Sequence, residues 1–140
     1  MKTRLIILFL LFFTTLGMFS QDMVRQGMIG LSKEEVIRKV KEEHRKFRKD
    51  DSVVKQQFNY VKYVNRERTK TWIIFFDEKD ICTVSKLVCD YSDFGETVKA
   101  LDKEFRKKAE LHWEYRQGRD LIQVEVEKKD WYYSVRETRK

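Results

Sequence analysis

The side chains best suited to catalysis or metal binding in this 140-residue chain are two histidines, His44 and His112, and two cysteines, Cys82 and Cys89. Such residues can form a zinc site or a cysteine–histidine nucleophile pair. Zinc motifs place their ligands a few residues apart, whereas these histidines are far apart and neither cysteine adjoins a histidine. The sequence also has no Gly-x-Ser-x-Gly elbow and no glycine-rich phosphate loop. It therefore predicts no metal, no cofactor and no catalytic residue, and an enzyme whose residues meet only in space remains an alternative.

The two cysteines lie seven residues apart in a stretch with the pattern of a strand. In one continuous strand they would be roughly 23 Å apart and on opposite faces. A disulfide needs Cα atoms within about 7 Å of each other. We therefore expect no disulfide between Cys82 and Cys89, but two small buried residues. A disulfide between two chains is the alternative.

Basic residues gather in four runs, at 45–49, 66–70, 106–108 and 136–140, and the chain has a net charge of +7. These runs could bind an anionic polymer or lipid headgroups. The alternative is that they mark turns and helix ends, where cations interact favourably with the helix dipole. Acidic residues are interspersed throughout, which is typical of a solvated surface, so nucleic acid is not the expected partner.

The aromatic residues at 131–133 predict an interface. Successive side chains of a strand point to opposite faces, so Trp131, Tyr132 and Tyr133 cannot all face the core. We expect Trp131 and Tyr133 to be core members of the last strand and Tyr132 to face outward. An exposed aromatic residue is a good anchor for a protein partner, so Tyr132 is the candidate interface residue. The edge of that last strand could also pair with a partner strand.

The first twenty residues have the order of a secretory signal peptide: basic Lys2 and Arg4, an uncharged apolar run, then small residues at Gly17 and Ser20. Cleavage could follow either small residue. The run is shorter than the roughly 20 residues that span a bilayer, so we expect no stable membrane span after signal removal; an uncleaved anchor is the alternative. No cysteine that could carry a lipid lies nearby. The sequence thus predicts a periplasmic or secreted protein.

The spacing of apolar and capping residues predicts the helices and strands that position these side chains, and it divides the chain into two similar halves. Ser32 and Glu35 have the spacing of a capping box, and an apolar stripe extends the expected helix from Ser32 to about Arg48. A second helix is expected from about Asp93, followed by a hairpin turn at Gly118. Three strands follow each helix, within 58–64, 72–76 and 81–88 in the first half and within 111–116, 122–127 and 131–135 in the second.

The resulting order, α-β-β-β-α-β-β-β, predicts an α+β fold in which two helices pack on antiparallel sheet. One six-stranded sheet and two smaller sheets both fit. We expect a signal peptide at 1–20, an N-terminal segment at 21–30 and a single domain at 31–140.

The stretch from Gly30 to Val36 resembles the helix opening of small bacterial envelope domains. These are the outer-membrane assembly lipoprotein family (SmpA/OmlA) and the β-lactamase inhibitor protein-like domains. The resemblance implies helices packed on an antiparallel sheet and a function in binding other proteins. It transfers no functional residue.

Three functions follow from these observations. The first is an exported, non-enzymatic domain that binds an envelope or extracellular protein through a sheet face, a sheet edge or both. The second is a surface binder of anionic polymer or lipid headgroups through the basic runs, and the third is an enzyme with an unrecognised site.

Overall fold

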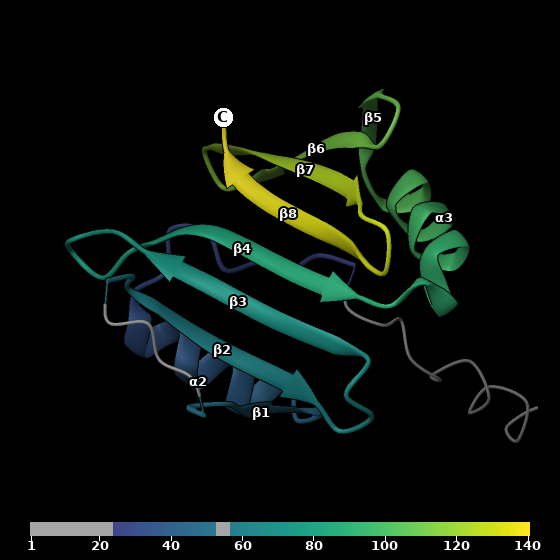
Figure 1. Cartoon of the computed structure of the whole chain (residues 1–140). Coiled ribbons are helices and arrows are strands. Elements are labelled where there is room, and N and C mark those ends of the chain that lie inside the picture. Colours follow the sequence, from purple (N-terminus) through teal and green to yellow (C-terminus); the bar gives the residue numbers. More distant parts are fainter. Residues whose placement is uncertain (1–23, 53–56) are drawn as a thin grey trace, which may run out of the picture.

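The computed structural model describes residues 24–52 and 57–140 (Figure 1). This part of the chain folds into an eight-stranded antiparallel sheet with two α-helices, so the predicted α+β class is confirmed. The predicted signal peptide at 1–20 lies outside the described residues. None of the helices within the described ranges is long and apolar enough to cross a membrane.

Within the described residues, each half consists of one α-helix followed by four strands, not by the three predicted. The first half contains α2 (Lys33–Glu43), β1 (Phe47–Lys49), β2 (Tyr60–Asn65), β3 (Lys70–Phe76) and β4 (Cys82–Cys89). The second contains a short 3-10 turn (Tyr91–Asp93), α3 (Phe94–Glu104), β5 (Arg106–Ala109), β6 (His112–Gln117), β7 (Asp120–Lys128) and β8 (Tyr133–Arg139). All strands belong to one sheet, in the order β1-β2-β3-β4-β8-β7-β6-β5.

The sheet order makes the two halves related by an approximate twofold axis between β4 and β8. The last strand of each half lies at the centre, and the short strands β1 and β5 form the two edges. The prediction that the last strand offers a free edge is therefore wrong, because β8 pairs with β4 on one side and with β7 on the other.

Helix α2 begins as predicted and ends earlier than predicted. The Ser32 side chain accepts from the Glu35 amide at 3.2 Å, and the Glu35 carboxylate accepts from the Ser32 amide at 2.8 Å, which confirms the capping box. The helix stops at Glu43, and His44 leaves the helical conformation. Phe47 extends the apolar stripe in sequence, but it lies in β1 and packs edge-on against Trp72, at 5.4 Å between ring centroids.

The basic run at 106–108 is also not a helix end. Helix α3 ends at Glu104, and the run forms the edge strand β5, whose four residues are all exposed. An edge strand that carries several cations resists pairing with other chains, since it would bring like charges together.

Both helices cover the same face of the sheet, which we call the core face. Helix α2 lies behind β2 in the view of Figure 1 and packs on Trp72 and Phe76, whereas α3 packs on Tyr133 and Trp113. Residues 24–30, expected to precede the domain, contribute to its core: Met28 and Ile29 are at most 1% exposed.

The cysteines share the core face because of a β-bulge. Phe75 pairs with Val84 and Phe76 pairs with Cys82, so Thr83 is an extra residue in β4. This insertion shifts the alternation by one position, and Cys82 and Cys89 are both buried as free cysteines. The prediction of opposite faces is wrong for that reason.

Candidate functional site

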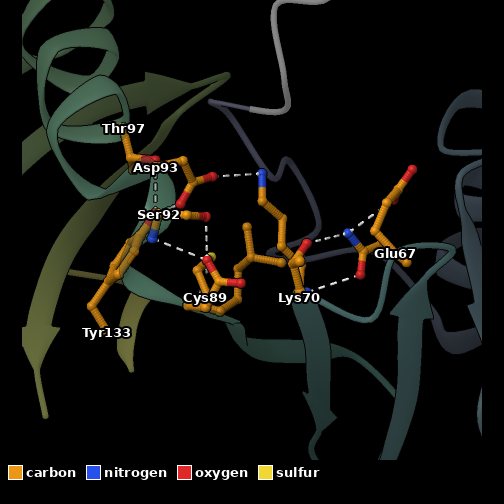
Figure 2. A network of polar contacts seen from close by, with 11 residues as sticks. Glu67, Lys70, Cys89, Ser92, Asp93, Thr97 and Tyr133 are labelled. Atoms are coloured by element: carbon orange, nitrogen blue, oxygen red, sulfur yellow. Dashed lines mark hydrogen bonds and ion pairs between the residues drawn. The ribbon is translucent and has the colours of Figure 1, made fainter. Parts of the chain in front are cut away.

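A polar network on the core face joins β3, β8 and the start of α3 (Figure 2). The Lys70 ammonium lies 3.2 Å from the Asp93 carboxylate, and the Tyr133 hydroxyl donates to the same carboxylate at 2.7 Å. The Thr97 hydroxyl lies 2.8 Å from the Tyr133 hydroxyl. Each charged or polar group is thus satisfied by a neighbour, and the network fixes α3 against both halves of the sheet.

A cavity of about 270 Å³ adjoins this network, between α3 and the sheet. Its walls include Lys70, Asp93 and the Cys89 thiol. Burial raises the pKa of Cys89 to about 11, and burial also raises the pKa of the Tyr133 hydroxyl. Both groups therefore stay protonated at neutral pH, the opposite of what an activated nucleophile or base requires.

A buried carboxylate lies on the same face but faces the N-terminal segment. Glu137 is fully buried, accepts from the Gln26 amide at 2.9 Å and from the Tyr115 hydroxyl at 2.5 Å. Burial raises the pKa of Glu137, while these hydrogen bonds act in the opposite direction. The Gln26 side-chain amide donates to the Val135 carbonyl, and its oxygen accepts from the Ser85 hydroxyl. This cluster attaches residues 26 and 27 to the centre of the sheet.

The two histidines remain far from a common site. His44 ends α2 and contacts the Trp72 ring edge-on at 5.1 Å, and its partial burial lowers its pKa. His112 is exposed on β6, as predicted, with its Nε2 3.6 Å from the Glu125 carboxylate. No group of three or more metal-ligating side chains occurs within the described residues.

No described element covers the face of the sheet opposite the helices. Its side chains alternate with the buried ones, and we call it the open face. One row crosses six strands at directly paired positions: Lys62, Ile73, Lys86, Arg136, Glu125 and His112.

The chemistry of the open face differs between the two halves. On β2, β3 and β4 apolar side chains surround Lys62 and Lys86. The partly exposed apolar residues are Val64, Ile73, Phe75, Val84 and Val88. The Tyr60 ring on β2 lies 6.0 Å from the Phe75 ring on β3, measured between centroids. Phe58, which is 54% exposed, lies just before β2. On β6 and β7 the open face is polar, with Glu114, Gln123, Glu125 and Glu127.

Two cations meet at the centre of the open face. Lys86 of β4 and Arg136 of β8 are directly paired across the junction between the halves. Like charges directly opposite each other destabilise a sheet. Among the described residues, neither side chain has a carboxylate within the 4.0 Å of an ion pair. The sequence could not show this pair, because it depends on which two strands meet at the axis.

The aromatic residues at 131–133 are arranged differently from the prediction. Tyr133 is buried, as expected, and Tyr132 is 39% exposed. Trp131 was expected in the core, but β8 begins only at Tyr133, and Trp131 lies in the preceding turn with 88% of its surface exposed. The alternation rule fails here because Trp131 lies outside the strand.

The basic runs do not converge on one surface. The first two adjoin, since the Arg66 amide donates to the Lys46 carbonyl at 3.1 Å. The third forms the edge strand β5, at the opposite end of the sheet from β1. The fourth lies mostly in the central strand β8.

No known protein family, characterised protein or solved structure matches the chain.

Proposed function

We propose that this chain is an exported, non-enzymatic domain that binds a protein partner through the open face of its sheet. The observation that carries the proposal is the uncovered sheet face, where the apolar residues of β2 to β4 adjoin Lys86 and Arg136. An apolar centre with cations beside it combines the two sources of affinity and specificity in protein interfaces. The resemblance of the helix opening to protein-binding envelope domains supports the same class, and the predicted signal peptide supports export.

The charges indicate the chemistry of the partner. A partner's carboxylate placed between Lys86 and Arg136 would offset the repulsion between these two cations. Binding of an acidic group at this position is therefore favoured. The apolar neighbours Ile73 and Phe75 require an apolar surface beside that group. We therefore expect a partner that presents one or two carboxylates next to exposed aliphatic or aromatic side chains.

Binding of anionic polymer or lipid headgroups is the competing function. It would need the basic runs to act together, and the third run is separated from the first two by the width of the sheet. Salt separates the two functions, because polymer binding weakens steeply as salt rises and an apolar interface does not.

The test is affinity capture of the tagged full chain from cells, with washes at low and at high salt, followed by crosslinking of the material that stays bound and its identification by mass spectrometry. Lys86→Glu and Phe75→Ala alter the open face. Lys41→Glu and Ile37→Ala are matched controls, since both residues are exposed on α2, on the other side of the sheet. We expect one or two proteins retained at both salts, lost with the open-face variants and kept with the controls. Material that is only polymer or lipid and is released by salt would refute the proposal.

A further inference from the structure

Trp131 is the most exposed large apolar side chain in the described part of the chain. It is 88% exposed, whereas the other two tryptophans, Trp72 and Trp113, are at most 1% exposed. A tryptophan is a large apolar side chain, and leaving it in water is unfavourable. Packing of the core therefore does not explain why a tryptophan occupies position 131.

The turn that carries Trp131 is held in place on both sides. The Lys129 amide donates to the Tyr132 carbonyl at 2.8 Å, which leaves Asp130 and Trp131 as a two-residue loop between β7 and β8. The Tyr91 hydroxyl donates to the Lys129 carbonyl. The Trp131 side chain is thus presented at the tip of an anchored hairpin, which lowers the entropy lost when it is bound.

Turn chemistry does not account for a tryptophan at this position. Two-residue hairpin loops favour Asn-Gly or Asp-Gly, because the loop residues adopt left-handed backbone angles. Asp130 and Trp131 are not among the non-glycine residues with positive φ. The side chain therefore contributes neither to the turn nor to the core.

The hairpin tip is electrically neutral. Glu127 and Asp130 balance Lys128 and Lys129, and the Lys129 ammonium lies 2.6 Å from the Glu127 carboxylate. Anionic lipid attracts clusters of unpaired cations, and a neutral tip with one tryptophan lacks that attraction. An apolar pocket in a protein fits it better, because tryptophan is the residue most enriched among interface hot spots.

The tip adjoins the open face. Trp131 and Tyr132 directly precede β8, and both are exposed. Within β8, Ser134 alternates with the core residues Tyr133 and Val135 and pairs directly with Val88. Val88 belongs to the apolar patch, the group of apolar open-face residues on β2, β3 and β4. A partner that covers the patch can therefore reach Tyr132 and Trp131 as well.

We infer that Trp131 inserts into an uncharged apolar pocket of the same protein that covers the open face, and acts as the hot spot of that interface. The inference rests on the proposed function and adds the anchor residue and the kind of pocket that receives it. Removal of a hot-spot side chain costs 2 kcal/mol or more, so Trp131→Ala should weaken binding by about 30-fold or more.

Site-specific photocrosslinking tests the inference in cells that make the full chain. The photoreactive amino acid p-benzoylphenylalanine replaces Trp131 in one variant, Thr138 on the open face in a second, and exposed Arg119 in the turn between β6 and β7 in a third. We expect positions 131 and 138 to capture the same protein, at apolar residues for position 131, and position 119 to capture nothing. In the purified complex, Trp131→Ala should lower affinity by the stated factor, and Trp131→Phe by less.

The other outcomes separate the two proposals. Capture from position 138 without capture from position 131 overturns the role of Trp131 and leaves the open-face function standing. Capture of a different protein, of lipid or of a second copy of the chain at position 131 also overturns it. Capture at neither position overturns both. An affinity that Trp131→Ala leaves unchanged overturns the inference even where the crosslink forms.

Discussion

Replacing Lys86 by glutamate should stabilise the fold while it removes partner binding. Lys86 faces Arg136 across the β4–β8 junction, and its other direct neighbour on the open face, Ile73, is uncharged. Directly paired charges change stability by about 0.2–1 kcal/mol, unfavourably for like charges and favourably for opposite charges. Reversal of one sign therefore yields a gain of about 0.4–2 kcal/mol. The middle of this range is about 1 kcal/mol. Lys86 also attracts Glu127, so we expect no more than this middle value.

The mirror substitution supplies the control. Arg136 has Lys86 on one side and Glu125 on the other, so Arg136→Glu gains one favourable pair and loses another. Arg136 also attracts Glu127, so the free energy of unfolding of this variant should stay close to that of the wild type or fall slightly, but should not rise. Thermal unfolding at low salt should show Lys86→Glu with a Tm about 4 °C above that of the wild type, and Arg136→Glu close to it. In about 1 M salt the difference should largely disappear, because screening then acts within about 3 Å. A lower Tm for Lys86→Glu at low salt would refute the assigned pairing and the argument for a carboxylate in the partner.

Two further predictions concern buried groups. Burial raises the pKa of Glu137 above its ordinary value of 4.5. The protonated side chain therefore contributes fully to stability below pH 4.5, and this contribution is lost as the pH rises through the raised pKa. The Tm of the wild type minus the Tm of Glu137→Gln should fall over this interval, and a constant difference from about pH 4 to about pH 8 would contradict the raised pKa. Burial raises the pKa of Cys89 to about 11 and that of Cys82 to about 12, so iodoacetamide at about pH 8 should modify both thiols in denaturant and neither in the folded protein. Mass spectrometry reads the result, and modification of the folded chain at the rate of a free thiol would show that the sites are open.

Local patterns predicted the features that local forces determine. The capping box at Ser32 and Glu35 depends on residues three apart, and the hairpin turn at Gly118 depends on one left-handed residue. Both are present as predicted. The alternation of apolar residues predicted the central strands for the same reason, since it reflects burial of one side of each strand.

The missed features depend on partners that are distant in sequence. Strands β1 and β5 contain mostly basic residues and form because β2 and β6 pair with them. The bulge at Thr83, which moves Cys82 to the core face, has no signal in residue type. The open-face site was missed for the same reason, because the pairing of Lys86 with Arg136 joins the last strands of two separate halves.

The approximate symmetry of the sheet sharpens the case for a specific partner. Topology places Lys86 opposite Arg136, and one strand further from the axis it places Ile73 on β3 in the position that Glu125 has on β7. Packing of the core does not require these outward side chains to differ. The difference makes the β2–β4 half of the open face richer in apolar side chains and the β6–β7 half richer in carboxylates. Under the proposed function, a partner that matches the apolar half therefore binds in one orientation. Trp131, exposed at the end of the β7–β8 hairpin, would add a further contact that distinguishes the two orientations, if it is the anchor that we infer.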